Sequence, residues 1–157
     1  MDLSSWGLGL ALIVLTIAIH TTAVVLLAFD LERRMIRVRA DGRKPDLRRA
    51  IMIVIGHIGT VAVILAALHG LEGVLWALAY WSIGALDSFS NASVYALATM
   101  TTFEIPGLTM LPRFQMISAL QAVNGVLLFG ISTAFLFAVI QVHWQLLSRR
   151  HEQSMTS

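Results

Sequence analysis

The sequence predicts an all-α membrane protein with three membrane-spanning helices and one shorter helix that enters the membrane without crossing it. Hydrophobic residues make up 57% of the 157-residue chain, and charged residues only 13%, about half of the roughly 25% found in soluble domains. Three apolar stretches are long enough to cross a bilayer, which takes about 20 helical residues. Together with a mean hydropathy of +0.79, these stretches place the chain in a membrane.

The first apolar stretch, residues 6–29, predicts a retained helix. It lacks a basic leading segment and a small-residue cleavage site, so it is not a signal peptide. Residues 30–49 are predicted to be a basic loop that holds eight of the eleven Lys and Arg residues. The positive-inside rule puts this loop in the cytoplasm and the N-terminus outside. The eight residues are expected beside anionic lipid headgroups, not nucleic acid: Arg33, Arg34, Arg37, Arg39, Arg43, Lys44, Arg48 and Arg49.

The second crossing is predicted over residues 50–68, with residues 69–73 at the outer boundary. Residues 74–86 are apolar but short. They either extend the second helix outward or lie along the membrane surface, where their aromatic side chains are suited to the interface.

A short helix is predicted over residues 87–102, followed by a loop over residues 103–112 and a long third crossing over residues 113–145. No Lys or Arg occurs between Arg49 and Arg113, whereas Arg149, Arg150 and His151 lie near the C-terminus, which predicts a cytoplasmic C-terminus. Ser90 and Asn91 can cap the short helix, and Pro106-Gly107 ends the segment in a turn. Irregular backbone at membrane depth is tolerated only where protein or a water-filled cavity surrounds it.

Residues 93–102, SVYALATMTT, resemble the pore helix of small bacterial potassium-channel-type proteins, which continue as T-T-x-G-Y-G-D. Residues 113–134 are similar to the inner helix of those proteins, and the resemblance covers residues 76–141. It implies a tetrameric pore-loop channel architecture in the bacterial inner (plasma) membrane, built as a homotetramer. The domains are then an N-terminal helix with its basic loop (1–49), a pore domain (50–147) and a cytoplasmic tail (148–157).

The filter segment departs from that family. The selectivity filter is expected at Thr101, Thr102, Phe103, Glu104, Ile105, Pro106 and Gly107. Glu104 and Pro106 replace the two glycines whose backbone freedom lets carbonyls point at potassium, so potassium selectivity is not expected. Four Glu104 carboxylates would instead form a ring that selects cations, with Ca²⁺ or Na⁺ as the permeant ion, protons also being candidates. Thr102 is the second expected cation ligand, and no resident cofactor is expected.

Several alternatives stay open at this point. Glu104 alone is also compatible with a local hydrogen bond at the interface, and Thr101 and Thr102 with a helix cap. Gly125 and Gly130 are candidates for a gating hinge or for close helix packing. A non-conducting channel-like protein is the alternative function, and a haem or metal protein using His20, His57 and His69 is the third.

No enzyme is predicted, because the sequence shows no catalytic triad, phosphate loop or catalytic carboxylate pair. The absence of cysteine also excludes disulfides and Cys-ligated zinc.

Overall fold

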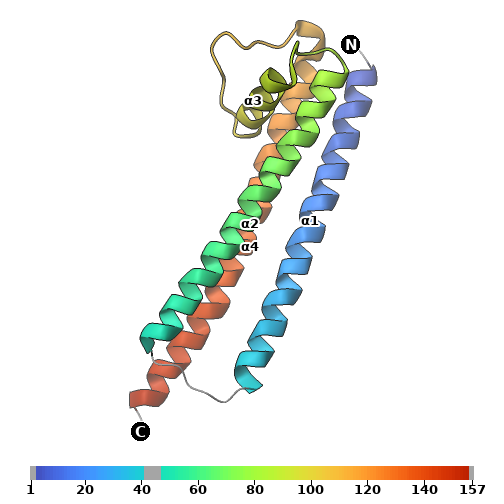
Figure 1. Cartoon of the computed structure of the whole chain (residues 1–157). Coiled ribbons are helices and arrows are strands. Elements are labelled where there is room, and N and C mark those ends of the chain that lie inside the picture. The colour runs from blue at the N-terminus through green and yellow to red at the C-terminus, as the bar shows by residue number, and fades with distance from the viewer. Residues whose placement is uncertain (1–2, 41–46, 156–157) are drawn as a thin grey trace.

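Four α-helices and one 3₁₀ helix make up the fold, and no strand occurs in the described parts of the chain (Figure 1). The computed structural model describes the backbone of residues 3–40 and 47–155, and the side chains of residues 6–33, 36 and 48–144. In chain order the helices are α1 (Leu3–Ala40), α2 (Leu47–Ser82), α3 (Phe89–Met100), the 3₁₀ helix η1 (Pro112–Phe114) and α4 (Gln115–Met155).

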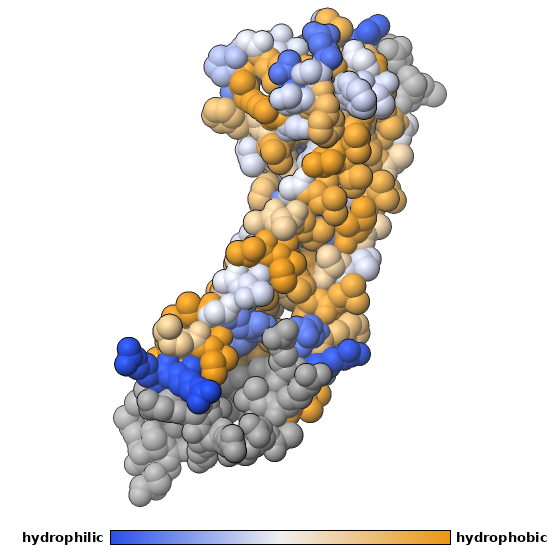
Figure 2. Space-filling view, in the orientation of Figure 1, coloured by the Kyte–Doolittle hydropathy of each residue, from blue (hydrophilic) through white to orange (hydrophobic). Residues whose placement is uncertain are grey.

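Three of these helices are long and apolar enough to cross a membrane, as the sequence predicted. The candidate spans are Trp6–Arg33, Arg48–Ser82 and Pro112–Trp144. Hydrophobic residues cover much of the long helical shaft, and hydrophilic residues gather toward its two ends (Figure 2). The chain is therefore compatible with an integral membrane protein.

The predicted basic loop over residues 30–49 is wrong in extent. Helix α1 continues to Ala40 and α2 begins at Leu47, because Glu and Arg are good helix formers that can extend a helix beyond its apolar span. Arg33, Arg48 and Arg49 are exposed there. The other predicted lipid contacts lie outside the described side chains: Arg34, Arg37, Arg39, Arg43 and Lys44.

Helix α2 runs without a break through residues 69–73 to Ser82, which decides between the two alternatives for the apolar segment that follows them. Residues 74–82 therefore extend the second helix. The glycines that suggested a boundary lie inside the helix, where Gly73 gives room to the side chain of Leu97: a Cβ at Gly73 would lie 2.7 Å from it. Small residues of this kind permit close packing between membrane helices.

Helix α2 ends in a Schellman motif. Gly84 has a φ of 66°, and the N–H groups of Ala85 and Gly84 donate to the carbonyls of Tyr80 (2.9 Å) and Trp81 (3.1 Å). Glycine is the usual residue at this left-handed position, because it has no Cβ to clash with the backbone. The motif turns the chain back toward α3.

Helix α3 lies within the predicted short helix, but the predicted cap at Ser90 and Asn91 is wrong, because both residues lie inside the helix. Ser88 is the N-cap and its side chain accepts from the N–H of Asn91 at 3.1 Å, which satisfies one of the free donors of the first turn. Helix α3 runs back along α2, because the ring of Phe89 lies beside Trp81 and Leu97 lies beside Gly73.

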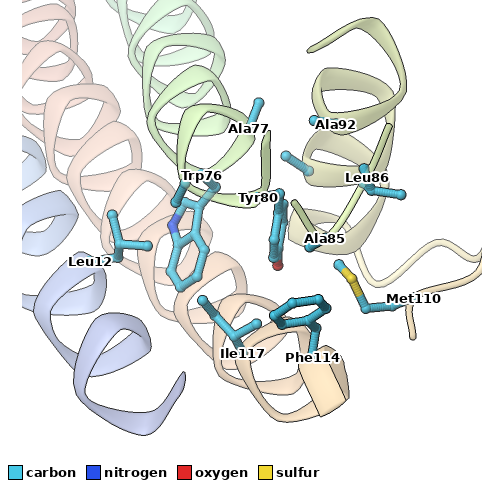
Figure 3. Packing of buried hydrophobic residues seen from close by; sticks show 12 residues of the cluster. Leu12, Trp76, Ala77, Tyr80, Ala85, Leu86, Ala92, Met110, Phe114 and Ile117 are labelled. Carbon is cyan, nitrogen blue, oxygen red and sulfur yellow. The ribbon is translucent and has the colours of Figure 1, made fainter. Parts of the chain in front are cut away.

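The apolar core lies where α3 packs against α2 and α4 (Figure 3). Trp76 and Tyr80 of α2 are fully buried there, and Ile117 of α4 and Leu12 of α1 complete the contact. Small side chains on the facing sides, such as Ala92, let the helices approach closely. Helix α3 is therefore anchored by the apolar core that it shares with α2 and α4.

Candidate functional site

The segment after α3 begins with a second Schellman motif. The N–H of Phe103 donates to the carbonyl of Ala98 at 2.8 Å, and the N–H of Thr102 to that of Thr99 at 2.9 Å. Thr102 occupies the left-handed position with a φ of 57°, which is strained for a β-branched residue. The hydroxyl of Thr101 donates back to Ala98 at 2.9 Å, so Thr101 caps the last turn. Thr102 donates its hydroxyl to the carbonyl of Thr101 at 2.7 Å.

Pro106 and Gly107 form the predicted turn. The N–H of Leu108 donates to the carbonyl of Ile105 at 3.1 Å, and Gly107 has a φ of 83°. Proline followed by a glycine with positive φ is typical of a type II turn. The carbonyl of Ile105 therefore already accepts a hydrogen bond within the loop.

Glu104 is exposed and lines a pocket of about 370 Å³ between this loop, α3 and the start of α4. Among the described residues no hydrogen bond or ion pair to its carboxylate is found. Phe103 is also exposed, at 65%, and Thr102 contributes to the same pocket. The hydroxyls of Tyr95 and Ser118, 2.8 Å apart, form part of the opposite wall. The loop therefore presents one unpaired acid and several hydroxyls to an open pocket.

Polar contacts hold α3 against its neighbours. The hydroxyl of Tyr80 donates to Oε1 of Gln121 at 2.6 Å, and Nε2 of Gln121 donates to the carbonyl of Ala96 at 3.0 Å. Gln121 is fully buried, so this amide joins α2, α3 and α4 at one point.

The two predicted hinge glycines have different surroundings. At Gly125 an added Cβ would collide with the backbone carbonyl of Met100, the last residue of α3. At Gly130 no atom lies within 4 Å of such a Cβ. Gly125 therefore serves close packing of α3 on α4 in this structure.

A second set of polar groups is buried between the three long helices. Asn124 donates to the hydroxyl of Thr16 at 2.8 Å, linking α4 to α1. His20 of α1 contacts Glu72 of α2 at 2.8 Å and Ser132 of α4 at 3.0 Å. All five side chains are buried.

The sequence pointed to His20 and His69 but not to Glu72 or Ser132 as their partners. Glu72 follows His69 by three residues, and this spacing places both side chains on one helix face. The spacing could therefore have identified Glu72 as a neighbour of His69. Because residues 69–73 were expected to mark a boundary, this pairing was not recognised from the sequence.

His57 of α2 and His143 of α4 form a separate pair. Nδ1 of His57 lies 3.2 Å from Nε2 of His143, and Nδ1 of His143 lies 2.8 Å from the carbonyl of Val139. The latter contact requires an N–H at Nδ1 of His143, so its Nε2 accepts from His57. The three histidines considered from the sequence thus divide between two sites.

No family model matches the chain, and neither the curated proteins nor the solved structures contain a significant match to it. The described residues form an all-helical fold with three helices long and apolar enough to span a membrane and a short helix packed against two of them, compatible with an integral membrane protein.

Proposed function

We propose that the chain is the subunit of a homotetrameric cation channel, in which residues 101–107 form the filter and Glu104 supplies a ring of carboxylates. The observation that carries the proposal is the placement of a short helix between two spanning helices, followed by a loop with an unpaired acid. Irregular backbone of this kind is accommodated in a membrane when it lines a water-filled path.

Four copies are needed because one subunit has too few helices to enclose a path for ions. In a four-fold assembly, the Glu104 carboxylates would converge on the axis, and rings of acids select cations. Four nearby like charges cannot all ionise without a compensating cation, so they titrate as a coupled set. Hard cations such as Ca²⁺ bind several oxygen ligands, and Na⁺ is the second candidate.

The hydroxyl of Thr102 supports the same proposal. It donates its hydrogen to the carbonyl of Thr101, which leaves the oxygen lone pairs free to accept a cation. Potassium selectivity is not proposed, because the carbonyls of Thr101 and Ile105, within the proposed filter, accept hydrogen bonds inside the subunit. A potassium filter uses stacked carbonyls that replace the hydration shell.

Ion flux through the purified protein in liposomes tests the proposal, comparing Ca²⁺, Na⁺ and K⁺. We expect cation flux that changes its selectivity or disappears in Glu104→Gln and Glu104→Ala. Asp87→Asn is the matched control, because Asp87 is also an exposed acid between α2 and α3 but lies outside the loop.

A second function is favoured by one observation. Two carbonyls of the proposed filter, those of Thr101 and Ile105, already accept hydrogen bonds within the subunit and are not free to face an ion. A folded tetramer without flux at several voltages and pH values would identify a non-conducting channel-like protein. Potassium-selective flux that neither Glu104 variant changes would refute the assignment of the filter.

A further inference from the structure

Four buried side chains from three helices form a closed ring inside the candidate spans. Nδ1 of His20 lies 2.8 Å from Oε1 of Glu72, and Nε2 of His20 lies 3.0 Å from Oγ of Ser132. Nε2 of His69 lies 3.1 Å from the same Oγ, and its Nδ1 lies 3.3 Å from Oε2 of Glu72. His20 and Glu72 are fully buried, and His69 and Ser132 are 8% exposed. Ionisable residues at such a depth are costly and usually functional.

The ring can exist without net charge. Its four contacts require four hydrogens, and neutral His20, His69, Ser132 and Glu72 supply one each. Moving one proton from Glu72 to a histidine gives an ion pair and leaves the total unchanged. A neutral set of this kind avoids the large cost of an isolated charge in an apolar medium.

One contact of the ring is incomplete. Nδ1 of His69 and Oε2 of Glu72 face each other at 3.3 Å, yet both buried atoms have no hydrogen-bond partner. Buried polar atoms without a partner are rare and call for an explanation. A ligand atom of His20 lies within 4.8 Å of ligand atoms of His69 and Glu72, so three potential ligands meet at this point.

We infer that His20, His69 and Glu72 form an intramembrane binding site for a borderline transition-metal ion, of which Zn²⁺ is the best example. One ligand atom from each residue lies within 4.8 Å of the others. Two histidines and one glutamate are a known ligand set for zinc, with the fourth position open to water. Zn–N and Zn–O bonds of about 2.0–2.1 Å in a tetrahedron place neighbouring ligands about 3.3–3.4 Å apart, close to the 3.3 Å between His69 and Glu72.

Ser132 has the position of an orienting residue. With both Nδ1 atoms on the metal, both Nε2 atoms carry hydrogen and donate to Oγ of Ser132, which has two lone pairs. Such outer partners fix the ring orientation of ligating histidines. Of the four ring hydrogens three remain, so binding of one ion releases one proton. The ring of Phe129 stacks on the imidazole of His69, with 4.2 Å between the two ring centroids, and covers this side of the site.

This site differs from the proposed Glu104 ring in its ligand chemistry. Imidazole nitrogen favours zinc-like ions, whereas carboxylate and carbonyl oxygens favour Ca²⁺ and Mg²⁺. Binding at the histidine site also needs no ion flux, so its test is independent of the proposed function.

The test is equilibrium binding of Zn²⁺ and Co²⁺ to the purified full-length chain in detergent. We expect one ion per chain and a Co²⁺ visible spectrum typical of four-coordinate nitrogen and oxygen ligation. Ser132→Ala should weaken binding about 10- to 100-fold, as for other outer partners, and His20→Ala, His69→Ala and Glu72→Gln should weaken it more. His57→Ala and His143→Ala are the matched controls, because they remove the other histidine pair, of which His143 is buried and His57 half-buried, and they should leave binding unchanged.

Helicity and elution volume show which variants are folded, and the wild-type Co²⁺ spectrum does not depend on any variant. The proposal is overturned if the wild type binds no Zn²⁺ or Co²⁺. It is also overturned if folded His20 and Glu72 variants bind as well as the wild type, or if binding is lost in the His57 or His143 variants instead.

Discussion

Thr102 has a backbone conformation that the chain elsewhere gives to glycine. Both α2 and α3 end in the same Schellman arrangement, with Gly84 at the left-handed position in one and Thr102 in the other. A left-handed conformation costs an L-residue about 1–2 kcal/mol. Strain of this kind often marks functional positions, and Thr102 directly precedes the loop with Glu104.

Replacing Thr102 tests this strain. We expect Thr102→Gly and Thr102→Asn to raise the free energy of unfolding by about 0.5–1 kcal/mol, since both residues tolerate the left-handed region. Thr102→Val keeps the strain and loses the hydrogen bond to Thr101, so it should lower stability. Thermal unfolding in detergent measures all three. A loss of stability in the glycine variant as large as in the valine variant would show that no strain is stored there.

At the scale of elements, the sequence predicted the extent of α3 well but left the end of α2 undecided. The limits of α3 follow from local chemistry: Ser88 caps its start and the polar stretch after Met100 ends it. Gly70 and Gly73 look like a boundary in the sequence, but the small size of Gly73 serves packing against α3, whereas no atom lies within 4 Å of a Cβ built at Gly70. The side chain that fills the space at Gly73 is Leu97, and no local pattern identifies it.

Gly125 and Gly130 make a matched pair on α4. Gly125→Ala should lower the free energy of unfolding by about 1–3 kcal/mol, because its Cβ would force the end of α3 away from α4. Gly130→Ala has free space and should be neutral or stabilising by up to about 1 kcal/mol, since alanine is the better helix former. Equal effects of the two substitutions on the unfolding midpoint would contradict the packing role of Gly125.

Gln121 links α2, α3 and α4, so its replacement should weaken the packing of all three helices and lower the free energy of unfolding. Gln121→Leu removes the hydrogen bonds to Tyr80 and Ala96, and we expect a loss of about 0.6–2 kcal/mol, the range for such bonds between membrane helices. Tyr80→Phe removes one of the two bonds and should cost less. Gln141→Leu, at an exposed position of the same helix, should not destabilise. Unfolding in detergent checks the order of the three variants.

For the whole molecule, composition and apolar length predicted three spanning helices, but not the contacts between them. His20 and Ser132 are 112 positions apart in the chain, and His20 and Glu72 are 52 apart. Spacing within one helix cannot show that such residues meet. Only the packing of α1, α2 and α4 brings the ring of His20, His69, Glu72 and Ser132 together.

The predicted orientation can be tested cleanly, because the chain contains no cysteine. A membrane-impermeant maleimide should label Asp87→Cys in intact cells, since the segment between α2 and α3 is expected outside. Asp41→Cys, in the basic stretch, should be labelled only after the membrane is permeabilised. The reverse labelling pattern would invert the topology.

The contact between Met100 and Gly125 also has a mechanical consequence. The end of α3, and with it the start of the loop that holds Glu104, rests directly on the backbone of α4. Rotation or bending of α4 at Gly125 would therefore displace this loop. A force on the C-terminal half of α4 would therefore reach this loop through the contact at Gly125, so that movement of the helix and movement of the loop would form a single coupled motion.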